Sequence, residues 1–438
     1  MTAVTRCTPP IEKMESTRRH IFLFISAKID IKLDNSKFFI YICTKIEKIA
    51  QLKAEKRYKI VYCTPALYMA GGVERVLTIK ANYFADVLNY DITIILTEGK
   101  DRPLYYPLSK RIKVVNLDIN FEELWSCSFL RKVIVYLKKQ RKYKKRLSAE
   151  LMTIRPDITI SLLRREINFI TKIHDGSKKV GELHVNRANY RNFESGDSNI
   201  IKNLFSKFWM NSLVSHLQKL DQFVVLTEED KQNWPEIQHI EVIPNPLAFK
   251  MDQKSDLSSK RVIAVGRYVY QKGFDLLLKA WSIVEKRNTD WNLVVFGQGS
   301  REPYENIIED LKIDKKRCHL LGPTNDIKKE YLDSSIFVFS SRYEGFGMVL
   351  VEAMSCGLPC VSFDCPCGPK DIISDGVDGL LVPNGDVKLL ADRLSELISH
   401  PDKMSHLSEL ALLKANTYSM DTISLKWRSM FDSLFEKS

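Results

Sequence analysis

Residues 261–273, RVIAVGRYVYQKG, decide the fold. The apolar run Val262–Val265 is typical of a strand that is buried on both faces of a sheet. Gly266 ends this run, and an apolar helical stretch begins after Gly273. A buried strand, a glycine turn and a helix make up the repeating unit of a parallel α/β sheet.

The same unit recurs on both sides of a break at Ile243-Pro244-Asn245-Pro246, where the prolines and the polar residues 250–260 predict a linker. The expected strands before the break are 58–63, 91–96, 112–117, 157–163, 179–183 and 222–226. Those after it are 261–266, 291–296, 318–321, 336–340 and 359–363. The sequence therefore predicts two doubly wound α/β domains, which bind ligands at the carboxyl ends of their strands.

The length of 438 residues also favours two domains over one. We expect an N-terminal extension over residues 1–56, a first domain over 57–243 and a second over 244–415. Residues 416–438 predict a C-terminal helix with one apolar face. That face consists of Ile423, Trp427, Met430, Phe431 and Leu434.

The composition is that of a globular protein, with 45% hydrophobic and 27% charged residues, and not that of a disordered or membrane-embedded one. The net charge of +12 favours an anionic partner without naming it. No apolar run has the length of a membrane-spanning helix, and the run after Arg19 is short for a signal peptide. These features predict a cytoplasmic protein.

Nine cysteines without evenly spaced pairs favour a reducing compartment over a disulfide framework. Cys356, Cys360, Cys365 and Cys367 lie close together in the sequence, and a zinc site is one interpretation of them. Their spacing lacks the paired C-x-x-C of structural zinc sites, so small buried thiols beside a strand are the favoured alternative.

A basic run extends from Arg131 to Arg146 on an expected helix. A solvated helix face explains it, and so does contact with an anionic membrane. No aromatic-interleaved or groove-reading motif accompanies the charge, which argues against nucleic acid as a partner.

Four glycine-marked clusters follow expected strands and therefore belong to the carboxyl edges of the sheets. Gly71 and Gly72 stand where the first strand turns into a helix, so their N–H groups can approach an anion, although a tight turn explains them equally well. Arg267 and Lys272 follow Gly266 in the second cluster. Two fixed cations at one strand end suit a diphosphate, and two solvated surface cations are the alternative.

The third cluster, Gly297-Gln298-Gly299, lacks the third glycine of a dinucleotide fingerprint but lets a phosphate or sugar approach. The fourth is the most specific: Glu344 precedes a glycine-bounded turn and Glu352 lies on the next helix. Both carboxylates can reach one elongated ligand and accept hydrogen bonds from its hydroxyls. The N–H groups at the start of that helix would face phosphates, and they belong to Gly347, Met348 and Val349.

The order of these clusters, with seven residues between Glu344 and Glu352, resembles the retaining glycosyltransferases of family 4. That family has the GT-B fold of two facing Rossmann-like domains. The resemblance covers roughly residues 57–438, includes Val225–Asp230 and Ile243–Pro246, and matches nothing in residues 1–56.

The resemblance implies roles for these residues. Arg267 and Lys272 would hold the donor diphosphate, Glu352 the ribose, and Glu344 the transferred sugar near its reacting carbon. His184 would be the active-site histidine, although a lone histidine is usually structural. No cofactor and no metal are implied. The glycines expected to line the donor site are Gly71, Gly72, Gly266 and Gly297.

The resemblance further implies a transferase that moves a hexose or N-acetylhexosamine from a nucleotide sugar, commonly a UDP-sugar, to a glycan or lipid-linked saccharide. Residues 362–369 are similar to those of members that assemble bacterial surface polysaccharides. In the family the C-terminal helix crosses back to the first domain, and packing on its own domain is the alternative. An idle nucleotide-sugar-binding scaffold and a GT-B epimerase remain alternative functions.

Overall fold

The structure is a computed structural model and describes residues 56–126, 128–190, 200–249 and 252–436. The chain divides into a unit Met1–Lys56 and a unit Arg57–Ser438. The expected extension over residues 1–56 lies outside the described residues except for Lys56. Every element described below belongs to the second unit.

Sheet A lies in the N-terminal half of the second unit and has seven strands in the order β3-β2-β1-β4-β5-β6-β7. Each pair of neighbouring strands in it is parallel. The strands are β1 (Lys59–Thr64), β2 (Asp91–Leu96), β3 (Lys113–Asn116), β4 (Ile158–Ser161), β5 (Lys178–Glu182), β6 (Gln222–Val225) and β7 (Ile240–Val242). The helices of this half are α3 (Gly72–Asp86), α4 (Phe129–Ile154), α5 (Ile200–Leu217) and α6 (Glu228–Gln232).

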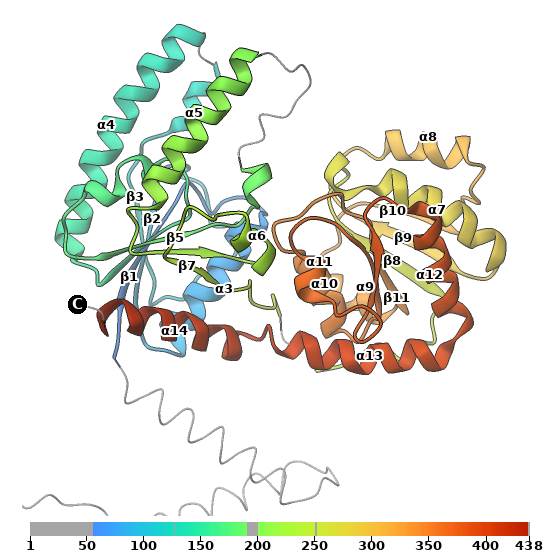
Figure 1. Cartoon of the computed structure of the whole chain (residues 1–438). Helices are drawn as coiled ribbons and strands as arrows, with labels where there is room; N and C mark the ends of the chain where they lie inside the picture. The colour runs from blue at the N-terminus through green and yellow to red at the C-terminus, as the bar shows by residue number, and fades with distance from the viewer. Residues whose placement is uncertain (1–55, 127, 191–199, 250–251, 437–438) are drawn as a thin grey trace, which may run out of the picture. The chain divides into compact units, whose positions relative to one another are not determined.

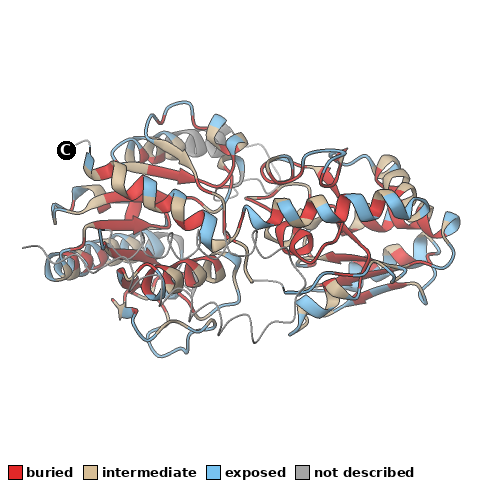
Figure 2. Ribbon diagram, turned by 90° about the horizontal axis from the view of Figure 1, so that it is seen from below, coloured by how far each residue is buried: buried red, intermediate tan, exposed pale blue. Residues whose placement is uncertain are grey.

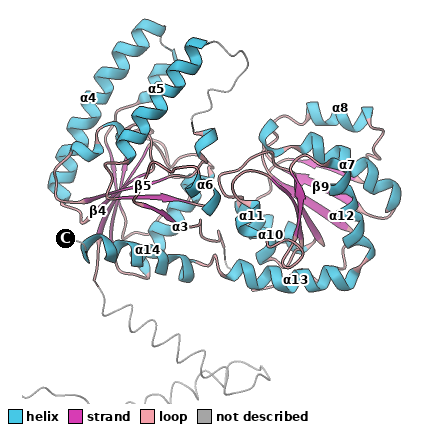
Figure 3. Ribbon diagram, viewed as in Figure 1, coloured by secondary structure: helices cyan, strands magenta, loops and turns pink. Residues whose placement is uncertain are grey.

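Sheet B follows with six strands in the order β10-β9-β8-β11-β12-β13, again all parallel. They are β8 (Arg261–Val265), β9 (Asn292–Phe296), β10 (Cys318–Leu321), β11 (Ile336–Phe339), β12 (Cys360–Asp364) and β13 (Leu380–Pro383). The helices between them are α7 (Phe274–Arg287), α8 (Glu302–Asp310), α9 (Ile327–Leu332), α10 (Met348–Ser355) and α11 (Pro369–Ile372). After β13 come α12 (Val387–Ser399), α13 (Pro401–Asn416) and α14 (Met420–Glu436). Figure 3 shows helices on both sides of each sheet.

The central strands are buried because helices cover both faces. Along β8, Val262 and Ala264 join one apolar cluster, and Ile263 between them joins another. Successive side chains of a strand point to opposite faces, so this strand contributes to two cores. Figure 2 shows the central strands mostly in red and the outward sides of the helices in pale blue.

The predicted class of two doubly wound parallel-sheet domains is confirmed. The predicted strands are all present, and their bounds differ by at most two residues. The edge strands β7 and β13 were not predicted. Both are short, and the residues of β7 are only half-buried, so neither has the long apolar run that marks a central strand.

The C-terminal helix α14 packs on elements of sheet A's half (Figure 1). The ring of Trp427 contacts Phe84 of α3 edge-on at a centroid distance of 6.4 Å. The hydroxyl of Tyr83 on α3 donates to Asp421 at 2.7 Å, and that of Tyr58 donates to Asp432 at 2.5 Å. The apolar face expected for this helix is buried.

Candidate active site

The turn after β8 is shaped by contacts between glycines. The N–H of Gly266 donates to the carbonyl of Phe296 at 2.9 Å. A Cβ on Gly297 would lie 1.8 Å from the carbonyl oxygen of Gly266, so only glycine allows the two loops to approach this closely. The stem of Lys272 lies over Gly266, where a Cβ would be 3.1 Å from Cγ and Cδ. Two of the predicted site glycines therefore bring two strand ends together and support the lysine.

Lys272 and Glu344 form an ion pair at the carboxyl edge of sheet B. The Nζ of Lys272 lies 2.6 Å from Oε1 of Glu344, and Ser341 Oγ donates to the same oxygen at 2.7 Å. Gly273, at φ +61°, makes this approach possible because a Cβ there would lie 2.1 Å from the carbonyl oxygen of Ser340. The resemblance implies that Lys272 holds the donor diphosphate and Glu344 the transferred sugar. In the structure the two charges pair with each other.

Arg267 is exposed at the same strand end. Its guanidinium has no hydrogen bond or ion pair within the part of the chain that the structure describes. It differs in this from Lys272, whose charge already has a partner. An unpaired guanidinium beside a paired lysine leaves net positive charge for an incoming anion.

Glu352 lies on α10, whose N-cap residue Gly347 has φ +94°. One oxygen of this buried carboxylate accepts from the guanidinium of Arg75 at 2.8 Å, and the other lies 3.4 Å from the hydroxyl of Tyr331. Burial raises the pKa of Glu352 although Arg75 acts in the opposite direction. Met348 and Val349, also predicted to face the donor, are half-buried in the first turn of α10.

The glycine pair before α3 adjoins a carboxylate of its own helix. Gly71 is the N-cap residue and Gly72 the first residue of α3. The side chain of Glu74 folds back over Gly71, where a Cβ would lie 1.8 Å from Oε2. A negative group thus already lies at this helix N-terminus, which is a favourable place for an anion.

His184 follows β5, and its side chain is only 6% exposed. Its Nε2 lies 3.2 Å from Oε1 of Glu182. Its carbonyl oxygen lies so close to Gly345 that a Cβ there would be 2.5 Å away, and the amide of Asn186 donates to the carbonyl of Glu344 at 2.7 Å. The loop that holds His184 therefore contacts the loop that holds Glu344.

Several residues near these groups were not predicted to take part. Arg75 pairs with Glu352, and Lys80 and Glu182 lie behind His184. Glu182 and His184 are two residues apart at the end of a strand, a spacing that puts their side chains on one face and could have drawn attention to Glu182. No local sequence pattern predicts the ion pairs of Arg75 and Lys80, because their partners lie far away in the sequence.

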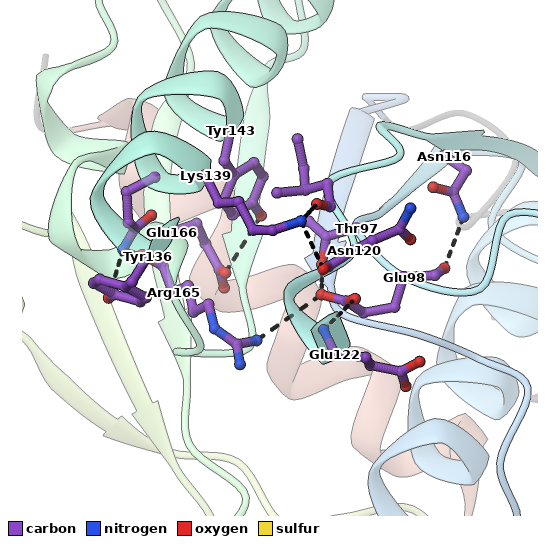
Figure 4. Close-up of polar contacts among 12 residues, drawn as sticks. Thr97, Glu98, Asn116, Asn120, Glu122, Tyr136, Lys139, Tyr143, Arg165 and Glu166 are labelled. Atoms are coloured by element: carbon purple, nitrogen blue, oxygen red, sulfur yellow. Dashed lines mark hydrogen bonds and ion pairs between the residues drawn. The ribbon is translucent and has the colours of Figure 1, made fainter. Parts of the chain in front are cut away.

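A polar network fixes the loops after β2 and β3 (Figure 4). The amide of Asn116 donates to the carbonyl of Glu98 at 2.7 Å, and the carboxylate of Glu98 accepts from the N–H of Glu122 at 3.3 Å. Lys139 of α4 donates to the carbonyls of Ile119 and Asn120 at 2.7 and 2.8 Å. The buried carboxylate and the lysine thus serve to hold these loops.

The basic helix α4 uses its charges in two ways. Lys139, Lys142 and Arg146 donate to carbonyls of residues 117–120. The other basic residues are exposed, and so are three apolar side chains. These exposed residues are Arg131, Lys132, Val133, Ile134, Leu137, Lys138, Arg141, Lys144 and Lys145.

The four clustered cysteines are buried, free thiols. Burial raises the pKa of each thiol, so they stay protonated at neutral pH. Among the described residues, no group of three or more His, Cys, Asp or Glu side chains is arranged to hold a metal ion. No helix in this part of the chain is long and apolar enough to cross a membrane.

Residues 248–412 match the family model described as "Glycosyl transferases group 1". The chain is also similar in structure to HepE of Anabaena in complex with UDP-glucose, with a TM-score of 0.63, 16% identity, and coverage of 86% of this chain and all of that one. The fold is GT-B.

Two curated relatives are similar in sequence over part of this GT-B chain. An uncharacterized glycosyltransferase of Haemophilus influenzae is 32% identical over 48% of this chain and 61% of its own length. A poly(ribitol-phosphate) alpha-N-acetylglucosaminyltransferase of Staphylococcus aureus is 28% identical over 59% of this chain and 52% of its own length. The chain thus spans little more than half of these relatives.

Proposed function

We propose that the protein is a retaining glycosyltransferase of the family 4 type, which moves a hexose or N-acetylhexosamine from a UDP-sugar to a glycan or lipid-linked saccharide in surface-polysaccharide assembly. The observation that carries the proposal is the arrangement of Arg267, Lys272 and Glu344 at the carboxyl edge of sheet B. The GT-B fold and the activities of the similar proteins support it.

The two halves of the chain would bind different substrates. Residues 244–415 bind the nucleotide sugar, residues 57–243 bind the acceptor, and the helix in residues 416–438 links the two. The diphosphate lies against Arg267 and Lys272 and takes over part of the interaction that Lys272 makes with Glu344. Glu344 is then free to accept a hydrogen bond from the transferred sugar.

The proposed chemistry is electrostatic. The bond between the anomeric carbon and the diphosphate breaks as an acceptor hydroxyl oxygen bonds to that carbon on the same face. The hydroxyl proton passes to the departing diphosphate. Positive charge develops on the sugar and negative charge on the leaving group, so fixed cations beside the diphosphate lower the barrier.

A donor panel tests this function. Purified protein and its Glu344→Ala variant are assayed for turnover of UDP-, GDP- and ADP-sugars with lipid-linked acceptors, in the presence of magnesium or a chelator. We expect turnover of one UDP-sugar that resists the chelator and is lost in Glu344→Ala. Binding of a donor without turnover under every condition would favour the idle scaffold, and production of an epimeric nucleotide sugar would favour the epimerase.

We also propose that α4 contacts an anionic membrane, where a lipid-linked acceptor would be found. Val133, Ile134 and Leu137 expose 46%, 57% and 52% of their surface among the basic residues of this helix. Exposed apolar side chains flanked by lysine and arginine are typical of helices that lie on anionic lipid.

Vesicle sedimentation tests this contact. Vesicles of phosphatidylcholine with phosphatidylglycerol should bind the protein at low salt, and Ile134→Ser with Leu137→Ser should weaken the binding. Leu413→Ser is the matched control, because Leu413 is 65% exposed on α13 of the other half. Equal binding by all three proteins, or none, would contradict the contact.

A further inference from the structure

A buried ion pair adjoins the imidazole of His184, and the reaction proposed above assigns it no role. Lys80 comes from the middle of α3 and Glu182 from the end of β5, and each side chain is only 1% exposed. The ammonium donates to Oε1 of the carboxylate. Both charges need this partner, because an unpaired charge in such a place is costly.

Two aromatic rings lie near the ammonium of this pair. The Nζ of Lys80 lies 4.3 Å from the ring centroid of Trp427 and 5.9 Å from that of Tyr62. Trp427 belongs to the C-terminal helix α14, so packing of that helix covers the ammonium. A cation over an aromatic face is favourable, most of all where water is excluded.

The carboxylate remains ionised despite its burial. Burial by itself would raise the pKa of Glu182, but its interactions with Lys80 and His184 outweigh burial and lower the pKa to about 2. A full negative charge is therefore held at a fixed place at the end of β5 at any pH near neutrality.

The imidazole of His184 lies directly against this carboxylate. The Nε2 of His184 is 3.2 Å from Oε1 of Glu182, but its N–H is not directed at that oxygen. Nε2 of the histidine and Oε2 of the glutamate are both buried without a hydrogen-bond partner among the described residues. A hydrogen bond from Nε2–H to Oε2 would give both atoms a partner.

Such a bond would determine what the other ring nitrogen does. When Nε2–H donates to a carboxylate, the neutral ring has its lone pair on Nδ1. Nδ1 has no hydrogen-bond partner in the part of the chain that the structure describes. The backbone of the same loop contacts Gly345 beside Glu344, so His184 adjoins the candidate donor site. A neutral ring with a free lone pair on Nδ1 would be able to accept a hydrogen bond from a sugar hydroxyl there.

We propose that Lys80 and Glu182 are positioning residues for His184: the enclosed pair holds a fixed carboxylate behind the imidazole, keeps the ring proton on Nε2 and orients Nδ1 toward a sugar hydroxyl. The proposal rests on the glycosyltransferase function proposed above. Neither residue touches the substrate, and both act through the histidine.

The ring nitrogens of His184 can be observed directly. Protein with ¹⁵N-labelled histidine is compared as wild type, Glu182→Gln and Asp175→Asn, with the His184 signals assigned from their loss in His184→Gln. Asp175 is the matched control because it forms a buried ion pair with Lys179 at the opposite end of the same strand. We expect the proton on Nε2 in wild type and in Asp175→Asn, and a mixture of tautomers in Glu182→Gln.

Kinetics give the second readout. Glu182→Gln should lower kcat about 10- to 100-fold with little change in the KM for the donor, by analogy with the partners that orient metal-binding histidines. Lys80→Met should have a similar effect if it folds, and Asp175→Asn should leave kcat unchanged. Unchanged tautomer and kcat in Glu182→Gln would overturn the proposal.

The two proposals fail in different ways. If His184→Gln turns over the donor as well as wild type does, the histidine has no part in the proposed reaction. If His184→Gln is slow but Glu182→Gln is as fast as wild type, only the positioning by Lys80 and Glu182 is wrong. The ¹⁵N spectra require no substrate and remain informative in either case.

Discussion

Two basic side chains of helix α3 each form an ion pair with a buried glutamate, and the two pairs differ in their exposure to solvent. Lys80, in the middle of the helix, pairs with Glu182 of sheet A, and both side chains are 1% exposed. Arg75, in the first turn, pairs with Glu352 of α10, and the arginine remains 31% exposed. Both members of the first pair are therefore buried, whereas in the second pair only Glu352 is buried.

The difference appears in the titration of the two carboxylates. Burial raises the pKa of both, but attraction to Lys80 and His184 lowers that of Glu182 to about 2, whereas that of Glu352 stays raised. Solvent screens an exposed guanidinium, so it compensates a buried charge less well than an enclosed ammonium does. A nearby cation therefore does not by itself offset the effect of burial on the pKa of a glutamate.

Substitution of each cation should show the largest difference in stability between the two pairs. Lys80→Met leaves a buried carboxylate unpaired and should lower the free energy of unfolding by about 3–5 kcal/mol. Arg75→Met should cost less than Lys80→Met, because water partly screens the guanidinium that it removes. Urea unfolding of the three proteins at pH 7 measures both values. Equal losses in the free energy of unfolding would contradict the claim that the two pairs differ in their contribution to stability.

The pH dependence of stability should have opposite signs. Glu182 has a lowered pKa, so its stabilisation is complete above about pH 4.5 and is lost as the pH falls toward 2. Glu352 has a raised pKa, so it favours folding below about pH 4.5 and loses that contribution as the pH rises through its folded pKa.

Glutamine variants show these signs in urea unfolding from pH 3 to 7. The stability advantage of wild type over Glu182→Gln should shrink as the pH falls. The advantage of wild type over Glu352→Gln should shrink as the pH rises. The same trend in both variants would mean that the pKa values of the two carboxylates are shifted in the same direction.

Sheet B offers a smaller effect of another kind, since glycine contacts shape its edge. Gly297→Ala puts a Cβ 1.8 Å from the carbonyl of Gly266 and should cost about 1–3 kcal/mol of stability, the usual cost of overpacking. Gly322→Ala is the control, because a Cβ there meets nothing within 4 Å. Similar thermal midpoints for the two variants would mean that the contact at Gly297 relaxes without cost.

The same contrast explains what the sequence could predict. Strands, glycine turns and the residues after them are local patterns, so Gly266, Lys272 and Glu344 were found at one edge of sheet B. The pairing of Lys80 with Glu182 joins residues 102 apart, and that of Arg75 with Glu352 joins residues 277 apart. A single sequence contains no signal for such contacts, because they depend on how strands order themselves and helices pack.

The central claim is that Lys272 binds the diphosphate of a nucleotide donor while Glu344 acts on the sugar. Calorimetric titration of UDP into wild type, Lys272→Ala, Glu344→Gln and Lys279→Ala tests it most directly. Lys279 is an exposed lysine of α7 and serves as the charge control. UDP should bind to wild type and equally to Lys279→Ala. Its affinity should fall about 10- to 100-fold in Lys272→Ala, which loses a charge-assisted hydrogen bond.

Glu344→Gln should bind UDP at least as tightly as wild type, because UDP lacks the transferred sugar that Glu344 would contact and Lys272 is no longer paired with a carboxylate. Equal affinity of Lys272→Ala and wild type for UDP, or no binding of UDP to any of the four proteins, would contradict the account.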